Sequence, residues 1–260
     1  MPKPSKDQEK YIRIKELRDR LRGLERAGGS IRKSLPFGLP ALDEALGGGL
    51  PLGCLHEIIG RDGDGAATGF CAALLARLAA AGRPVLWCQR AFDLYGPGLA
   101  ELGLDPDRLI VLAAGRPAER LQAMEEGLRC PALAAVLAEV DGVDLTTTRR
   151  LQLAAETGGV TGFVRRLGDG AAATAAVTRW RVTAAPAGHG VDRSVSSSPR
   201  ETVGKWLGAP RWRVELLRCR GGQSGNWLID WVEGGWRDAT DTVALAAALR
   251  DGPAARAARA

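Results

Sequence analysis

The chain lacks the features that mark membrane, secreted and zinc-binding proteins. No apolar run reaches the roughly 18 residues of a membrane-spanning helix. The five cysteines form no CxxC pair and, like the two histidines, are scattered, so neither a disulfide framework nor a structural metal site is expected. The start of the sequence is too charged for a signal peptide. We therefore expect a cytoplasmic protein with reduced thiols, no bound metal and no membrane contact.

Charge is unevenly distributed along the sequence. Residues 1–34 hold 11 Lys/Arg and 5 Asp/Glu, residues 35–145 hold 8 and 15, and residues 146–220 hold 13 and 5. Basic segments on either side of an acidic one can bind phosphate backbones or acidic proteins. The alternative is an ordinary solvated surface in an arginine-rich chain, and the sequence leaves both open.

Apolar segments typical of buried strands alternate with segments of helical pattern through the first two-thirds of the chain. Buried strands are expected at 54–60, 83–89, 106–114, 132–140 and 160–166, and helices at 40–46, 68–82, 96–103, 117–130 and 145–159. Continuously apolar strands separated by helices predict an α/β fold with a largely parallel sheet covered on both faces.

The last third has a different pattern. Polar and apolar residues alternate at 177–185, 211–220 and 226–233, which predicts antiparallel strands added to the sheet. We expect three parts in all: an amphipathic helical arm over 1–34, a core over 35–237 and a short helix with a disordered tail over 238–260. Within the core, the Ser/Gly/Pro-rich segment 186–209 is expected to be a flexible loop.

A glycine-rich turn, GRDGDGAATGF at 60–70, connects the first buried strand to the helix that follows. This is the usual setting of a phosphate-binding loop, in which the amides at the start of a helix hold an anion. The turn contains no lysine and two aspartates.

The stretch that leads into this turn resembles recombinases of the RecA/RadA type. The matching residues are Leu42, Asp43, Leu46, Gly47, Gly49, Leu50, Pro51, Gly53, Glu57, Ile58 and Gly60. The resemblance implies a RecA-like P-loop NTPase core and continues, more weakly, to about residue 185.

One degenerate branch, the ImuA family, is more similar. The lysine-free loop, TRWRV at 178–182 and PRWRVELLRCRGG followed by GNWLIDW carry this likeness. It implies a role in SOS-induced, error-prone translesion synthesis beside ImuB, an inactive Y-family polymerase relative, and an error-prone C-family polymerase. RecA is a further implied partner, and DNA contact is expected to be indirect or weak. The same superfamily contains SulA, an SOS inhibitor of cell division, so binding of FtsZ is the rival reading.

Against the phosphate-loop pattern GxxxxGK[ST], the turn keeps the glycines and loses the chemistry. Ala66 stands at the lysine position and Ala67 at the Ser/Thr position, with the Thr68 hydroxyl one residue late. Each loop aspartate would repel a bound phosphate by about 1 to 4 kcal/mol. The degenerate loop comprises Gly60, Asp62, Asp64, Gly65, Ala66, Ala67 and Thr68. We expect no cofactor, with weak ATP binding as the alternative.

The other catalytic parts of a RecA-like ATPase are also missing. The position of the glutamate that activates water is held by about Arg90, and the Walker B position offers Glu139. Glu139 alone cannot carry out phosphoryl transfer. We therefore expect no catalytic residue and a protein that is not an enzyme.

Two apolar helix faces are candidates for partner binding. The arm presents Ile14, Leu17, Leu21 and Leu24 at helical spacing, and the C-terminal helix presents Val243, Leu245 and Leu249. The arm resembles in position the RecA segment that packs on a neighbouring protomer, and its apolar face would be covered either by a partner or by packing on its own core.

Two further clusters have competing interpretations. Arg149, Arg150, Arg165 and Arg166 would form a basic rim at the carboxyl end of the sheet, or belong to exposed helix and strand ends. The tryptophans of the last third, interleaved with arginines, predict a core, a protein interface or a surface for single-stranded nucleic acid.

Overall fold

The computed structural model describes residues 33–61, 63–168, 172–186, 209–232 and 234–239. Several sequence-based predictions fall outside these ranges. They concern most of the arm and its residues Ile14, Leu17, Leu21 and Leu24, the loop residues 187–208, Asp62, and the C-terminal residues Val243, Leu245 and Leu249.

The described chain follows the predicted order of elements. The strands are β1 (Ser34–Leu35), β2 (Leu50–Pro51), β3 (Leu55–Gly60), β4 (Val85–Gln89), β5 (Leu109–Ala113), β6 (Ala135–Val140), β7 (Thr161–Leu167), β8 (Thr178–Ala184), β9 (Arg211–Cys219), β10 (Gly225–Val232) and β11 (Gly235–Asp238). The helices are α2 (Pro40–Leu46), α3 (Ala66–Ala79), α4 (Gly96–Glu101), the 3-10 turn η1 (Pro106–Arg108), α5 (Pro117–Leu128) and α6 (Leu145–Gly158). The predicted α/β fold is confirmed, with element ends between 40 and 167 shifted by at most three residues.

Nine of the described strands form one mixed sheet in the order β11-β10-β9-β8-β3-β7-β6-β4-β5. Strands β3 to β8 are all parallel to their neighbours among themselves, and β9, β10 and β11 add antiparallel pairs. The prediction for β8 holds on one side only: it pairs antiparallel with β9, as expected, but parallel to β3. Polar and apolar residues alternate along β8 because one of its faces is not packed on the core. This alternation is the same whether a strand runs parallel or antiparallel to its neighbour.

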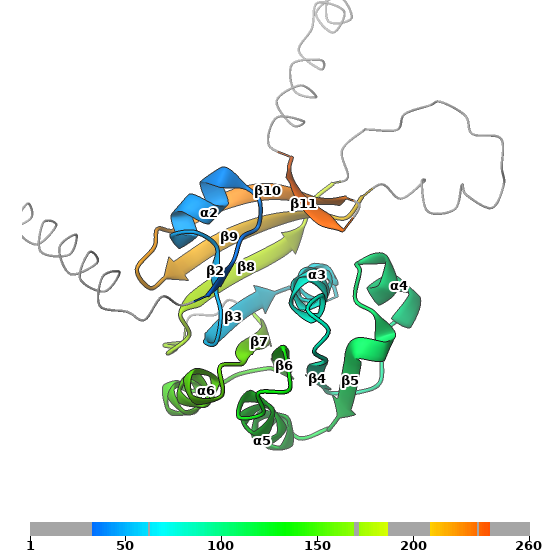
Figure 1. Ribbon diagram of the computed structural model, residues 1–260, viewed down its shortest axis with the longest axis vertical. Coiled ribbons are helices and arrows are strands. Elements are labelled where there is room, and N and C mark those ends of the chain that lie inside the picture. Colours follow the sequence, from blue (N-terminus) through cyan, green and yellow to red (C-terminus); the bar gives the residue numbers. More distant parts are fainter. Residues whose placement is uncertain (1–32, 62, 169–171, 187–208, 233, 240–260) are drawn as a thin grey trace, which may run out of the picture.

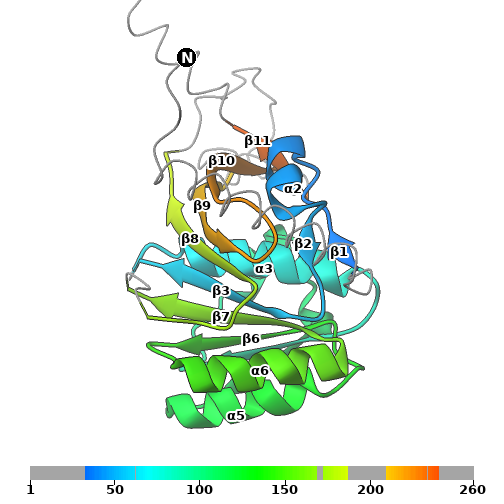
Figure 2. The same cartoon turned by 90° about the vertical axis from the view of Figure 1, so that its left-hand side faces the viewer.

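Helices cover the two faces of the parallel half of the sheet. Figures 1 and 2 show α3 on one face and α5 beside α6 on the other. Helix α3 begins at Ala66, two residues earlier than predicted, and its alanine-rich sequence is almost wholly buried. Small side chains allow close approach: a Cβ on Gly60 would lie 2.5 Å from the Cβ of Ala67. This contact fixes α3 directly over the end of β3.

The tryptophans of the antiparallel half belong mainly to the core. Trp180, Trp212, Trp231 and Trp236 are buried with Phe37 and Phe70, and Trp231 and Trp236 have ring centroids 4.8 Å apart. Each such aromatic pair contributes about 0.5–1.5 kcal/mol beyond its buried area. Of the three interpretations, the core is therefore confirmed for these four tryptophans.

Candidate functional site

The glycine-rich turn has the strand–turn–helix shape of a phosphate loop. It leaves β3 at Gly60 and enters α3 at Ala66, and Gly63 and Gly65 adopt left-handed backbone conformations, with φ of 76° and 62°. Left-handed residues strongly favour glycine because a Cβ would collide with the backbone. The retained glycines thus account for the shape of the turn without any bound anion.

An acidic side chain of the protein occupies the amide that a phosphate would use. The Asp64 carboxylate accepts a hydrogen bond of 2.9 Å from the backbone N–H of Ala66, the first residue of α3. The first amides of a helix have no partner within the helix and attract anions. Ala66 and Ala67 are themselves buried and carry no charge, so this helix start is served by an internal carboxylate.

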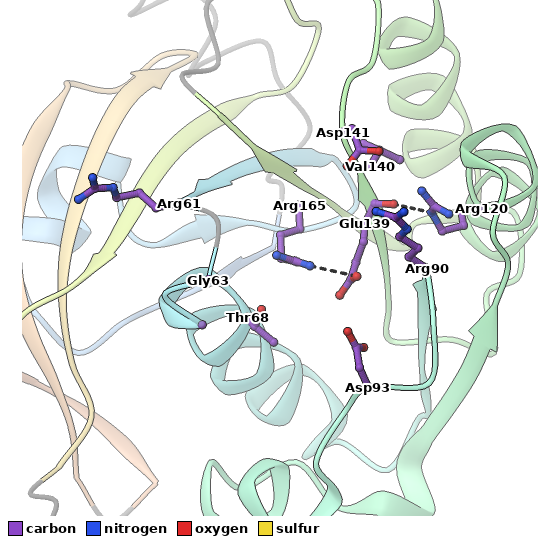
Figure 3. A pocket seen from close by; sticks show the side chains of 11 residues that line it. Arg61, Gly63, Thr68, Arg90, Asp93, Arg120, Glu139, Val140, Asp141 and Arg165 are labelled. Atoms are coloured by element: carbon purple, nitrogen blue, oxygen red, sulfur yellow. Dashed lines mark hydrogen bonds and ion pairs between the residues drawn. The ribbon is translucent and has the colours of Figure 1, made fainter.

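A pocket of about 330 Å³ opens beside the turn, at the carboxyl ends of the parallel strands (Figure 3). It is lined by Arg61, Gly63, Gly65, Thr68, Arg90, Asp93, Arg120, Glu139, Val140, Asp141 and Arg165. Open α/β sheets usually bind ligands at this edge. Here four arginines and three carboxylates line the same space.

Glu139, at the Walker B position, is held by two side chains. One carboxylate oxygen accepts a hydrogen bond of 2.9 Å from the indole N–H of Trp87, and the other lies 3.0 Å from Arg165 Nη2. Figure 3 shows Arg165 directed toward Glu139, its neighbour on the adjacent strand. The carboxylate that would bind a metal-nucleotide complex in an ATPase therefore joins β4, β6 and β7 here.

Arg120 is a site residue that the sequence reasoning missed. It is 2% exposed, yet it carries a guanidinium. Its Nε donates to the carbonyl of Glu139 at 2.6 Å, and its Nη1 donates to the carbonyls of Ala114 and Gly115 at 2.5 and 3.0 Å. It thereby attaches α5 to the carboxyl ends of β5 and β6. The signal was present: Arg120 stands four residues before Met124, on the apolar stripe of its helix.

The four arginines of the predicted basic rim do not form one surface, and this prediction is corrected. Arg165 lies on the pocket face with Glu139, whereas Arg166 bonds Glu57 at 2.6 Å on the other face. Successive strand residues point to opposite faces, so two neighbours on β7 cannot share a rim. Arg150, on α6, pairs with Glu125 of α5 at 2.6 Å. Arg149 is exposed on α6.

Arg90, at the position of the activating glutamate, lines the pocket and is exposed. Arg61 lines it from the glycine-rich turn. Neither has a hydrogen bond or ion pair with another residue in the described part of the chain. Thr68 contributes a hydroxyl from the first turn of α3, with no lysine before it.

His56 belongs to a buried network away from this pocket. Its Nδ1 lies 2.7 Å from the Thr178 hydroxyl and its Nε2 donates to the carbonyl of Pro51 at 2.9 Å, while the Cys54 thiol lies 3.5 Å away. Burial lowers the pKa of His56 from 6.5 to about 4. The imidazole is therefore neutral at pH 7 and joins β3 to β8.

Neither a metal-binding cluster nor a membrane-spanning helix is found among the described residues. No group of three or more His, Cys, Asp or Glu side chains is placed to hold a metal ion in the described ranges. None of the helices in the same part of the chain is both long enough and apolar enough to cross a bilayer.

The chain is similar to known proteins over most of its length, although no protein-family model matches it. It is 42% identical over 217 residues to Protein ImuA of Caulobacter vibrioides, in strain NA1000/CB15N and in strain ATCC 19089/CB 15. Each alignment covers 77% of this chain and 84% of the relative.

Proposed function

The chain belongs to the ImuA family of bacterial mutagenesis-cassette proteins, and from that membership we propose that it is a non-catalytic adaptor in damage-induced, error-prone translesion synthesis. Its partners in this proposal are an ImuB-type inactive Y-family polymerase relative, RecA and an error-prone C-family DNA polymerase. In this role the P-loop fold serves as a rigid scaffold, and contact with DNA is indirect or weak.

The observation that carries the proposal is the hydrogen bond from the Ala66 amide to the Asp64 carboxylate. A triphosphate at this loop would have to displace an anion that is part of the chain, and would find alanine where a lysine ammonium is needed. Repulsion from one nearby carboxylate amounts to about 1 to 4 kcal/mol. The engagement of Glu139 with Trp87 and Arg165 further supports a structural use of this site.

The arginine pairing also supports a weak or indirect role for DNA. Glu57 pairs with Arg166 and Arg179, and Asp230 pairs with Arg211. Guanidinium groups that already neutralise carboxylates release few counterions when a phosphate backbone approaches. The basic composition of residues 146–220 is in this way partly used inside the described fold.

The experiment that tests the proposal separates nucleotide chemistry from partner binding. Isothermal titration with ATP and Mg²⁺ should give no binding, and cells carrying Thr68→Ala or Asp64→Ala should keep wild-type damage-induced mutagenesis. Co-purification of the ImuB-type partner encoded in the same operon should succeed. ATP turnover that is lost in Thr68→Ala would contradict the non-catalytic role.

Overexpression of the protein in cells tests the alternative function, inhibition of cell division. Overexpression with ordinary growth and septation argues against a SulA-like inhibitor of FtsZ. Filamentous cells together with failure to bind the ImuB-type partner would favour that inhibitor and refute the adaptor.

A further inference from the structure

Within the described residues, strand β5 is an apolar edge of the sheet without the usual protection. It lies at the end opposite β11 and pairs only with β4 among the described strands (Figure 1). Its sequence, LIVLA, has no charged residue and no proline, and Ile110 and Leu112 are 49% and 37% exposed. Natural edge strands are normally guarded by charges, prolines, bulges or a cover because they attract other strands.

Two exposed aromatic side chains belong to the same end of the sheet. Phe92 and Tyr95 are 80% and 73% exposed, in the connection between β4 and α4. The N–H of Ala114 donates to the carbonyl of Gln89, so the carboxyl end of β5 adjoins the start of this connection. The two most exposed large apolar side chains of the described residues, Phe92 and Tyr95, are therefore near a strand edge that no described strand covers.

The peptide groups of β5 alternate between its neighbour and the outside. Because Ala114 bonds to β4, the alternation of a ladder directs the peptide groups of Ile110 and Leu112 to β4 as well. Those of Leu109, Val111 and Ala113 then point away from the sheet. Three residues with outward donors and acceptors can pair with one added strand.

We propose that β5 pairs antiparallel with β5 of a second copy of this chain, about a two-fold axis at Val111. In this register Val111 faces Val111 of the second copy, and Leu109 faces Ala113. These are the residues with outward peptide groups, so each pair exchanges both of its hydrogen bonds. A two-fold contact requires such a self-complementary surface.

The side chains and charges match in the same register. Ile110 faces Leu112 of the second copy, so the exposed aliphatic groups cover one another on one face of the joined sheet. Asp107 comes beside Arg116 of the second copy at each end of the paired strands. Both residues are exposed; the Arg116 side chain is 84% exposed and also pairs with Glu119 of its own copy at 3.0 Å. Apolar groups in the centre and opposite charges at both ends favour a copy of β5 over an unrelated strand.

The proposal of a dimer does not depend on the proposed adaptor role. The contact itself is small. Five paired residues and a few exposed side chains bury less than the roughly 1,200 Å² of a stable standard interface. We therefore expect a reversible dimer that forms at micromolar concentration.

Sedimentation velocity on the full-length protein tests the contact. The wild-type protein should shift from monomer to dimer with rising concentration, and Leu112→Lys should weaken the dimer by at least about tenfold, since a charge on an edge strand blocks pairing. Leu153→Lys is the matched control, because Leu153 is 63% exposed on α6. Thermal unfolding checks that both variants fold.

Cysteine pairing tests the register. In a Cys130→Ser background, which removes the exposed thiol of the described residues, Ile110→Cys and Leu112→Cys proteins are oxidised separately and as a mixture. Facing residues of a non-hydrogen-bonded pair have Cα atoms about 4.5 Å apart, within disulfide range. A crosslinked dimer should form in the mixture and not in either protein alone.

Three results would overturn the proposal. They are a monomer at every concentration, a dimer that Leu112→Lys leaves unchanged, and a monomer whose binding of the ImuB-type partner is lost in Leu112→Lys. The third would assign the edge to that partner.

Discussion

Glu57 and Arg166, 109 positions apart in the chain, meet at 2.6 Å inside the sheet, and Arg179 lies 2.8 Å from the other oxygen of the same carboxylate. Glu57 is 1% exposed. It stands on β3 between β7 and β8, the two strands that carry its partners. The acidic residue of the RecA-like stretch therefore joins β7 and β8, the two parallel strands on either side of β3.

Replacing Glu57 with Gln should cost about 3–5 kcal/mol of unfolding free energy, because the buried Arg166 and the partly buried Arg179 lose their counter-charge. Urea unfolding measures the loss. Glu215→Gln is the matched control: its pair with Arg181 is about one-third exposed on both sides, and such pairs are worth about 0–1 kcal/mol. Equal losses in the two variants would show that the Glu57 cluster contributes no more than a surface pair.

Acid should destabilise the protein through His56. Its pKa is about 4 in the folded protein and 6.5 in the unfolded chain, so the unfolded chain binds the additional proton between these values. Stability is then fully present above pH 6.5 and falls as the pH drops towards 4, by about 3 kcal/mol in total. Urea unfolding at a series of pH values measures this slope.

The control for the acid effect is His56→Asn, which removes the titrating group. Carboxylates titrate in both proteins below about pH 5, so the difference between the two stability curves isolates the imidazole. Parallel curves between pH 6.5 and 4.5 would mean that His56 is not responsible for the slope.

Much of the fold could be predicted from the sequence, because it is encoded locally. Apolar strands and helical stripes located the elements between 40 and 167 to within three residues, and Pro106 explains why the strand predicted from 106 begins later, after η1. Strand direction is not local. The alternation in β8 follows from its uncovered face, and only the assembled sheet reveals that β8 runs parallel to β3.

The site was less predictable because its chemistry depends on pairing. The alternation of side chains along a strand is enough to separate Arg165 from Arg166 once residues 160–166 are recognised as a strand. The partners of these two residues, Glu139 and Glu57, lie on other strands, so no spacing in the sequence identifies them. Asp64 was predicted to repel phosphate; its bond to the Ala66 amide depends on where α3 begins, which the sequence placed two residues too late.

The contact of Gly60 with Ala67 can be tested by exchange. Gly60→Ala places a Cβ 2.5 Å from the Ala67 Cβ, so helix and strand must move apart, at a cost of about 1–3 kcal/mol. Adding Ala67→Gly removes the obstructing methyl group. The double variant should therefore be more stable than Gly60→Ala, although glycine in a helix costs about 1 kcal/mol. A double variant less stable than both single variants would contradict this packing.

Arg120 should be more important for stability than Arg116 or Arg129, the exposed arginines at the two ends of its helix. In Arg120→Met the carbonyls of Glu139, Ala114 and Gly115 lose their donors, and each buried acceptor left without a partner costs about 1–3 kcal/mol. We expect a loss of about 3 kcal/mol or more in urea unfolding. Arg129→Met, at the end of the same helix, removes half-exposed pairs with Glu125 and Glu126 and should cost less than about 1 kcal/mol. Similar losses would mean that water replaces the guanidinium at the three carbonyls, and that the pocket beside Arg120 is open to solvent at its base.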